Sequence, residues 1–145
     1  MDKELKSSKW HLVINNPADV GMTHEKIKLT VENMKAVEYW CMCDEIGLSG
    51  IYHTHIFISF AIAKCFSKLK NDFPQAHIEA AKGILQDNRD YIAKDGKWEK
   101  DIKHEINLPD TFEEFSNISL KCQKKRKNTL FNKMLKCMER MRTKE

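Results

Sequence analysis

Glycine, proline and long apolar segments are scarce in this chain, and each scarcity excludes a class of protein. There are five glycines and three prolines in 145 residues, and no G-x-x-x-x-G-K-[ST] motif occurs, so we expect no P-loop ATPase. No apolar run approaches the roughly 20 residues that cross a bilayer, and the first residues, Met1 to Lys6, lack the apolar core of a signal peptide. We therefore expect an intracellular protein without a membrane partner.

Cysteines are too few and too irregular for a disulfide framework. The five lie at positions 41, 43, 65, 122 and 137, an odd number without the spacing of a secreted scaffold. Free thiols of this kind are typical of a reducing compartment.

Charge is distributed unevenly along the chain. The formal net charge is +4, but residues 121–145 carry ten Lys/Arg against two Glu, whereas residues 1–120 are net acidic. The run Lys124-Lys125-Arg126-Lys127 suits an anionic partner such as nucleic acid, although a solvated helix face explains such a run equally well.

The order of predicted elements indicates an α+β fold. Strands are expected at 10–14, 37–45, 51–60 and 75–81, with a fifth around Trp98 or at 102–107. Helices are expected from the N-cap Thr23 to 35, at 63–72 and at 84–94. This order predicts a central antiparallel sheet of about five strands with helices packed on it.

We divide the chain into three parts. Residues 1–8 form a flexible N-terminus, residues 9–109 a compact domain that ends near Pro109, and residues 110–145 a basic tail. After a turn at 111–115, a helix from about Ile118 carries apolar residues at three- and four-residue steps between Leu130 and Met141. This stripe suits either oligomerisation or packing against the chain's own domain.

Two histidines stand at a spacing of two within the strand 51–60. Alternate residues of a strand share a face, so His53 and His55 point the same way, and the more apolar set Tyr52, Thr54, Ile56, Ile58 and Phe60 takes the core face. Co-facial imidazoles suit a divalent metal, whereas an isolated pair is more often a polar decoration of a solvated sheet.

The hairpin before this strand offers a third ligand. With strands 37–45 and 51–60 paired around the loop 46–50, an even register places Glu45 on the face of His53 and His55, and Asp44 on the other face. Two imidazoles and a carboxylate leave open positions on Mg²⁺ or Mn²⁺, as catalysis requires. The same parity aligns Cys41 and Cys43, so a tetrahedral zinc site is the competing reading.

A nucleophile is available on the helix at 84–94. Tyr91 and Lys94 are three residues apart and so are neighbours on one helical face. A phenol has a pKa near ~10 and needs help to attack at neutral pH. Lys94 would stabilise the phenolate or the charge of the transition state, and a metal would polarise a scissile phosphate.

Three stretches together resemble the HUH-type rolling-circle replication initiators. The segment 10–17 (Trp-His-Leu-Val-Ile-Asn-Asn-Pro) is similar to their motif I, His53-Thr54-His55 to the metal motif II, and 88–96 to the Tyr-x-x-Lys motif III. They occur in family order, and the segment 76–83 is especially like the circovirus-type initiators, which group with geminivirus and plasmid relatives. Thr54 departs from the usual bulky hydrophobic residue, on the face away from the metal.

The resemblance implies a ferredoxin/RRM-like HUH endonuclease fold and a nicking and joining activity. Tyr91 would attack single-stranded DNA at an origin stem-loop, giving a 5′-phosphotyrosine and a free 3′-OH, for rolling-circle replication of a small circular virus or plasmid genome. Glu45, His53 and His55 would hold Mn²⁺ or Mg²⁺, and Lys94 would assist. We expect DNA contacts from Trp10, Asn15, Asn16, Lys64, Lys68, His77, Arg89 and Lys97.

The resemblance also implies partners and a location. Viral relatives continue into a helicase domain, so the chain is expected either to rely on a separate or host helicase and polymerase or to be the N-terminal part of a longer protein. It would act in the cytoplasm of a bacterial host or the nucleus of a eukaryotic host. A non-catalytic single-strand-binding module of RRM type and a zinc-stabilised interaction module are the alternatives.

Overall fold

A computed structural model describes residues 4–47, 49–98 and 105–117 of the chain, except the side chains of Lys97 and Glu105. The elements in chain order are β1 (Lys6–Asn15), η1 (Pro17–Val20), α1 (His24–Glu32), β2 (Val37–Gly47), β3 (Tyr52–Cys65), α2 (Phe66–Asp72), β4 (His77–Ala80), α3 (Leu85–Ala93), η2 (Gly96–Trp98), β5 (Glu105–Asn107) and β6 (Glu113–Ser116). The predicted α+β class is confirmed.

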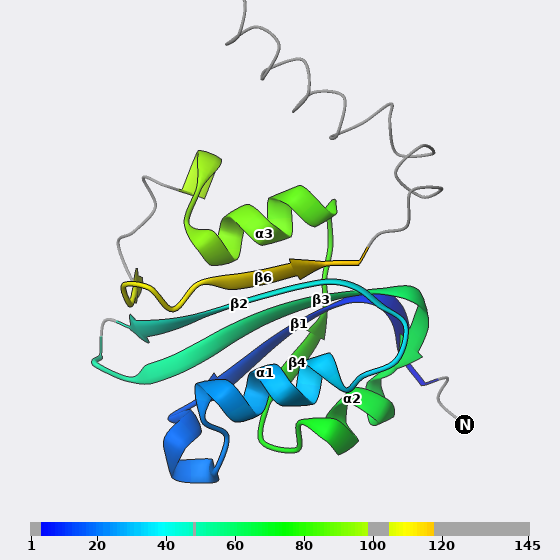
Figure 1. Cartoon of the computed structure of the whole chain (residues 1–145), viewed down its shortest axis with the longest axis horizontal. Coiled ribbons are helices and arrows are strands. Elements are labelled where there is room, and N and C mark those ends of the chain that lie inside the picture. The colour runs from blue at the N-terminus through cyan, green and yellow to red at the C-terminus, as the bar shows by residue number, and fades with distance from the viewer. Residues whose placement is uncertain (1–3, 48, 99–104, 118–145) are drawn as a thin grey trace, which may run out of the picture.

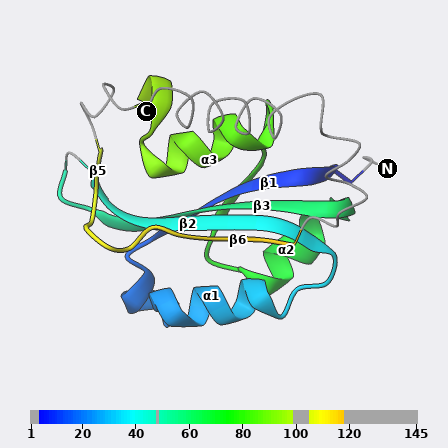
Figure 2. The same ribbon diagram turned by 45° about the horizontal axis from the view of Figure 1, so that its top comes forward.

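A single antiparallel sheet forms the middle layer of the molecule. Its order is β4-β1-β3-β2-β5, and β6 also pairs with β2. Helices α1 and α2 cover one face, and α3 covers the other, as Figures 1 and 2 show. The long central strands β1, β2 and β3 thus have a helix layer on each side.

The face under α1 and α2 carries the larger apolar core. Strand alternation sends Trp10, Leu12 and Ile14 of β1 to this face, and all three are almost completely buried. Burial of each large apolar side chain contributes roughly 1.5–3 kcal/mol. Ile27 and Val31, one helical turn apart on α1, pack onto it. The predicted N-cap is confirmed, since the Thr23 side chain accepts from the Lys26 amide.

The face under α3 carries a smaller core. Tyr39, Cys41 and Phe57 from the sheet meet Ile92 of α3, and all four are buried. Towards the β2–β3 hairpin, the same face carries the buried polar side chains of Glu45, His53 and His55. The functional candidates of the sequence lie at that end.

Two segments at the same end of the β1–β3 pair differ from the sequence-based expectation. Residues 63–65, expected to start a helix, extend β3 because Lys64 and Cys65 pair with Ser7 and Lys6 beyond an irregularity in the β1–β3 register. For the same reason β1 begins at Lys6, inside the segment 1–8 that was expected to be flexible.

Beyond residue 98 the sheet gains two short strands. The turn expected at 111–115 contains β6, which pairs with Tyr39–Met42, so the sheet has six strands and uses residues on both sides of Pro109. The fifth strand lies at Glu105–Asn107, whereas Trp98 lies in η2. The basic tail from 118 lies outside the described residues. Among the described helices, none has the length and apolar character that a membrane crossing requires.

Candidate metal and nucleophile site

The hairpin register brings Glu45, His53 and His55 together. Glu45 lies directly opposite His53, and Cys43 lies opposite His55, as the even register requires. The side chains of Glu45, His53 and His55 are buried on the sheet face that α3 covers, and Glu45 is fully buried. The predicted register, which places Glu45, His53 and His55 on one face of the sheet, is therefore confirmed.

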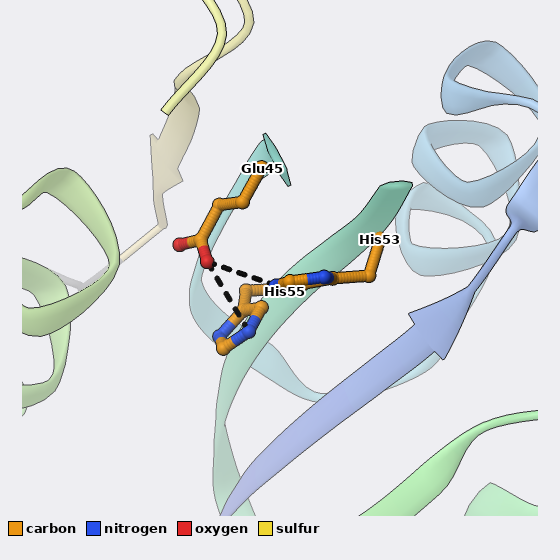
Figure 3. A group of neighbouring side chains, drawn as sticks. All are labelled: Glu45, His53 and His55. Carbon is orange, nitrogen blue, oxygen red and sulfur yellow. Dashed lines mark hydrogen bonds and ion pairs between the residues drawn. The ribbon is translucent and has the colours of Figure 1, made fainter. Parts of the chain in front are cut away.

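The donor atoms of these residues converge on one point. Glu45 Oε2 lies 3.1 Å from His53 Nε2 and 3.4 Å from His55 Nε2, and one ligand atom from each residue fits within 4.8 Å of the others (Figure 3). A fully buried carboxylate needs cationic or hydrogen-bonding partners. Two imidazole nitrogens and a carboxylate oxygen are donors that a divalent cation accepts, so the residues fit a metal site.

Lys94 reaches into the same cluster from the end of α3. Its Nζ lies 2.8 Å from Glu45 Oε1, the oxygen turned away from the histidines, and 4.9 Å from the ring centre of Tyr91. The backbone of Lys94 is left-handed, at φ 60°, and its amide bonds to the Asp90 carbonyl as an αL helix end. A non-glycine residue there carries strain of order 1 kcal/mol. That conformation places a cation between the carboxylate and the phenol.

Tyr91 stands beside the histidine cluster within a group of aromatic rings. Its ring centre is 6.1 Å from that of His55 and 5.0 Å from that of Trp98. The helix that carries it is tied to the sheet by Asn107 of β5, whose Nδ2 donates to the Ile92 carbonyl at 2.9 Å. The residue expected to act as nucleophile is thus fixed next to the candidate metal ligands.

His11 is a member of this site that the motif reasoning missed. Its ring centre is 5.2 Å from that of His55 and 5.6 Å from that of Tyr91, edge-on in both contacts. The signal in the sequence was the alternation of β1. Because Trp10 and Leu12 face the core, His11 between them has to face α3.

Asp44 faces the other way and serves a separate polar network. Its carboxylate accepts from Thr54 Oγ1 at 2.7 Å, from Tyr52 Oη at 2.9 Å and from His24 Nδ1 at 3.0 Å. The other ring nitrogen of His24 lies 2.6 Å from Glu113. Burial alone would lower the pKa of His24, but its bonds to the two carboxylates outweigh that effect and raise the pKa. Asp44 is therefore satisfied without a metal.

The alternative zinc site is not supported. Cys41 lies in the apolar core under α3, and the Cys43 thiol bonds to the Asp44 carbonyl. Burial raises the pKa of the Cys41 thiol to about 12 and also raises that of Cys43, because desolvation disfavours the charged thiolate. Within the described residues, the metal-compatible group consists of Glu45, His53 and His55 and includes neither cysteine.

The expectation that Trp10 contacts DNA is wrong. The indole is fully buried under α1 and α2, packs against Phe66 and donates from Nε1 to the Ser7 carbonyl at 2.7 Å. A base cannot stack on a side chain that the core covers completely. The motif-I tryptophan has a packing role here.

Arg89 is also directed away from a DNA role. Its guanidinium bonds to Asp90, Asp95 and Glu114, and it lies 5.1 Å from the ring centre of Phe112. Desolvation opposes the charge, but these bonds outweigh it and raise the pKa of Arg89. Arg89 thus joins α3 to β6 through Glu114.

The remaining expected DNA contacts fall into two groups. Lys64 lies at the far end of β3 from His53, roughly 35 Å along an extended strand at 3.3 Å per residue, and Lys68 lies on α2 across the sheet. Asn15, which pairs with His53, the exposed turn residue Asn16, and the exposed His77, which lies opposite Val13, are on or beside the site's face. Lys97 lies in η2, and its side chain is outside the described set.

Comparison with known proteins agrees with this geometry. Residues 7–95 match the family model described as "Putative viral replication protein". The replication-associated protein of pigeon circovirus is 29% identical over 65% of this chain and 28% of its own length, and that of porcine circovirus 1 is 34% identical over 61% and 28%. The master replication protein of banana bunchy top virus is 26% identical over 59% and 27%.

The match to these relatives is partial. The aligned region spans about a quarter of the length of each of the three relatives. The residues matched by the family model, 7–95, include the motif-I segment of β1, the hairpin with Glu45, His53 and His55, and α3 with Tyr91 and Lys94. The family match covers more than half of the chain, and the chain belongs to the circovirus-like family of viral replication proteins.

Proposed function

We propose that this protein is a replication initiator that nicks single-stranded origin DNA through Tyr91 and stays joined to the 5′ phosphate. The observation that carries the proposal is the position of the Tyr91 ring, 6.1 Å from the ring of His55, in a site that also holds Glu45, His53 and Lys94. A phenol, an ammonium and a metal-ligand triad gathered in one cluster are the groups that phosphoryl transfer to tyrosine needs.

The reaction is a transesterification that balances without a cofactor being consumed. The Tyr91 oxygen forms a bond to phosphorus, and the bond from phosphorus to the 3′ oxygen breaks. The phenol loses one proton, and the leaving 3′ oxygen takes up one proton to become the 3′-OH. Because one phosphodiester replaces another, the reverse attack by a 3′-OH rejoins the strand. The same site therefore supports both nicking and joining.

Each group of the site has a distinct task in this proposal. Lys94, 4.9 Å from the Tyr91 ring centre, stabilises the negative charge that develops as the phenol loses its proton. Glu45, His53 and His55 would hold Mg²⁺ or Mn²⁺, which supplies Lewis-acid polarisation of the phosphate when bound. Trp98 packs against Tyr91 and holds the ring in place.

The DNA would lie on the face of the sheet that carries α3. Asn15, Asn16 and His77 stand on or beside that face and offer hydrogen bonds to a strand approaching Tyr91. The partner is single-stranded origin DNA, for example the loop of a stem-loop. Unwinding and synthesis would come from a helicase and a polymerase that the described domain does not contain, and the basic tail would add DNA contacts or an oligomer interface.

The test is covalent capture. The full chain is incubated with a library of single-stranded oligonucleotides and Mn²⁺, and products are resolved on a denaturing gel and sequenced. We expect a protein–DNA adduct with wild-type protein and none with Tyr91→Phe, which lacks only the attacking oxygen. Tyr39→Phe is the matched control, because Tyr39 bonds to Glu114 away from the cluster.

Two outcomes would contradict the proposal. An adduct that persists in Tyr91→Phe would mean that another residue attacks. DNA binding without any adduct in wild-type protein would leave a single-strand-binding module as the function.

A further inference from the structure

His11 is the one ring of the site that touches both the proposed nucleophile and a proposed metal ligand from a third element. Tyr91 comes from α3 and His55 from β3, whereas His11 comes from β1. Its ring centre lies 5.6 Å from that of Tyr91 at an interplanar angle of 68°, and 5.2 Å from that of His55 at 66°. Both are edge-to-face contacts, which aromatic rings favour because a positive edge meets a negative face.

The backbone fixes where the His11 ring stands. His11 lies opposite Phe57 of β3 and opposite Glu79 of β4, so it is held between two strands. Its neighbours Trp10 and Leu12 are fully buried on the other face, and they prevent a change of register that would turn His11 away. The His11 ring is thus held in place by the sheet, whereas α3 packs on the sheet through a core smaller than the one under α1 and α2.

We infer that His11 is a positioning residue for Tyr91. Its ring limits the tilt of the phenol and keeps the attacking oxygen beside the His53–His55 pair. This inference rests on the proposed function, since positioning matters only if Tyr91 attacks. Misplacement of a reacting group by about 1 Å costs up to a hundredfold in rate, so loss of one wall of a three-ring group (His11, His55 and Trp98) is expected to cost roughly tenfold.

The experiment compares His11→Ala, His11→Phe and wild-type protein in single-turnover adduct formation with Mn²⁺ and one cleavable oligonucleotide. We expect His11→Ala to lower the maximal rate of adduct formation roughly tenfold, with the DNA concentration for half-maximal rate unchanged. His11→Phe restores a ring of similar reach and is expected to recover most of the rate. Ser59→Ala, a buried change on the same sheet face away from the rings, is the control for general loosening.

A second readout does not depend on activity. The chain has three tyrosines, so the Tyr91 ring signals in an aromatic ¹H–¹³C spectrum can be assigned by comparison with Tyr91→Phe. We expect these signals to shift in His11→Ala, because a neighbouring ring current is lost, and to remain in place in Ser59→Ala.

The outcomes separate this inference from the proposed function. Adduct formation at the wild-type rate in His11→Ala would overturn the positioning role and leave the nicking reaction intact. A His11→Phe variant as slow as His11→Ala would also overturn it, because the ring itself would then not be the cause. Absence of any adduct in wild-type protein would overturn the proposed function first.

Discussion

The two faces of the sheet differ in what they bury. The α1/α2 face buries many large apolar side chains and the self-contained network around Asp44. The α3 face buries a smaller core together with Glu45, His53 and His55, and the partly buried ring of Tyr91 packs against that core. Adjacent residues in β2 illustrate the contrast. The Asp44 carboxylate accepts hydrogen bonds from three side chains of its own face. The Glu45 carboxylate instead contacts two imidazoles and the Lys94 ammonium, the groups of the candidate site.

We therefore expect the free energy of unfolding to depend mainly on the α1/α2 face, and the proposed chemistry to depend on the cluster under α3. Substitutions under α1 and α2 should change the free energy of unfolding and leave the chemistry of folded molecules intact. Substitutions of Glu45, His53 or His55 under α3 should do the reverse.

The largest effect is expected for Glu45→Gln. This change keeps the shape of the side chain but removes the charge that the histidines and Lys94 surround, so Mn²⁺ binding and metal-dependent adduct formation should fall at least a hundredfold. Calorimetric titration with Mn²⁺ and the denaturing-gel assay measure both, and EDTA should reproduce the loss in wild-type protein. Cleavage that survives both the substitution and chelation would remove the metal from the proposal.

The next effect is expected for Trp10→Ala. Removal of a fully buried indole should lower the free energy of unfolding by about 3–5 kcal/mol. Urea denaturation measures the loss. If Trp10 is only a core residue, affinity for single-stranded DNA per folded molecule should match wild type, and a selective loss of affinity in a stably folded variant would restore the stacking role that the sequence suggested.

A smaller effect is expected for Asp44→Asn. The variant keeps the side-chain volume but weakens the hydrogen bonds from Thr54 and Tyr52 and the pairing with His24, at a cost of about 2–3 kcal/mol in unfolding free energy. Mn²⁺ affinity should stay near wild type because the carboxylate lies on the opposite face from Glu45. A loss of Mn²⁺ affinity as large as in Glu45→Gln would break the division between the faces.

The smallest effect concerns pH. The pKa of His24 is raised in the folded protein, so the stability it contributes is present below its unfolded value near 6.5 and is lost as pH rises through the folded pKa. The pKa of Glu113 is lowered mainly by its bond from Lys28, so its contribution is present above 4.5 and is lost as pH falls through the folded pKa. His24→Gln should therefore cost about 1 kcal/mol near pH 6 and less near pH 9, as urea midpoints at the two pH values would show. Equal costs at both would mean that His24 is not charged in the fold.

Strand parity was the part of the site that the sequence could predict. A hairpin with period two left a single arrangement that joined Glu45 to His53 and His55, and the structure has that register. The alternation of β1 implies that His11 faces α3, a consequence that the motif reasoning missed, and only the packing of α3 shows that its ring meets Tyr91. Such packing depends on tertiary contacts and carries no local signal.

Trp10 and Arg89 show the opposite limit. A tryptophan in a DNA-associated motif suggests base stacking, yet alternation with Leu12 and Ile14 makes it a core residue. Arg89 was expected to contact DNA on the resemblance alone. Its carboxylate partner Glu114 lies in a segment predicted as a turn, and that segment pairs with β2 as β6. Long-range pairing of short edge strands is weakly encoded in local pattern.

The link between Lys94 and Glu45 spans 49 residues of chain, and His11 is still farther from Tyr91 in the sequence. The parts of the site therefore come together only when distant segments of the chain pair, and contacts so distant in sequence form slowly. No local segment holds the whole cluster on its own. If the proposed function holds, the appearance of the covalent adduct during refolding would report that β1, β3 and α3 have come together.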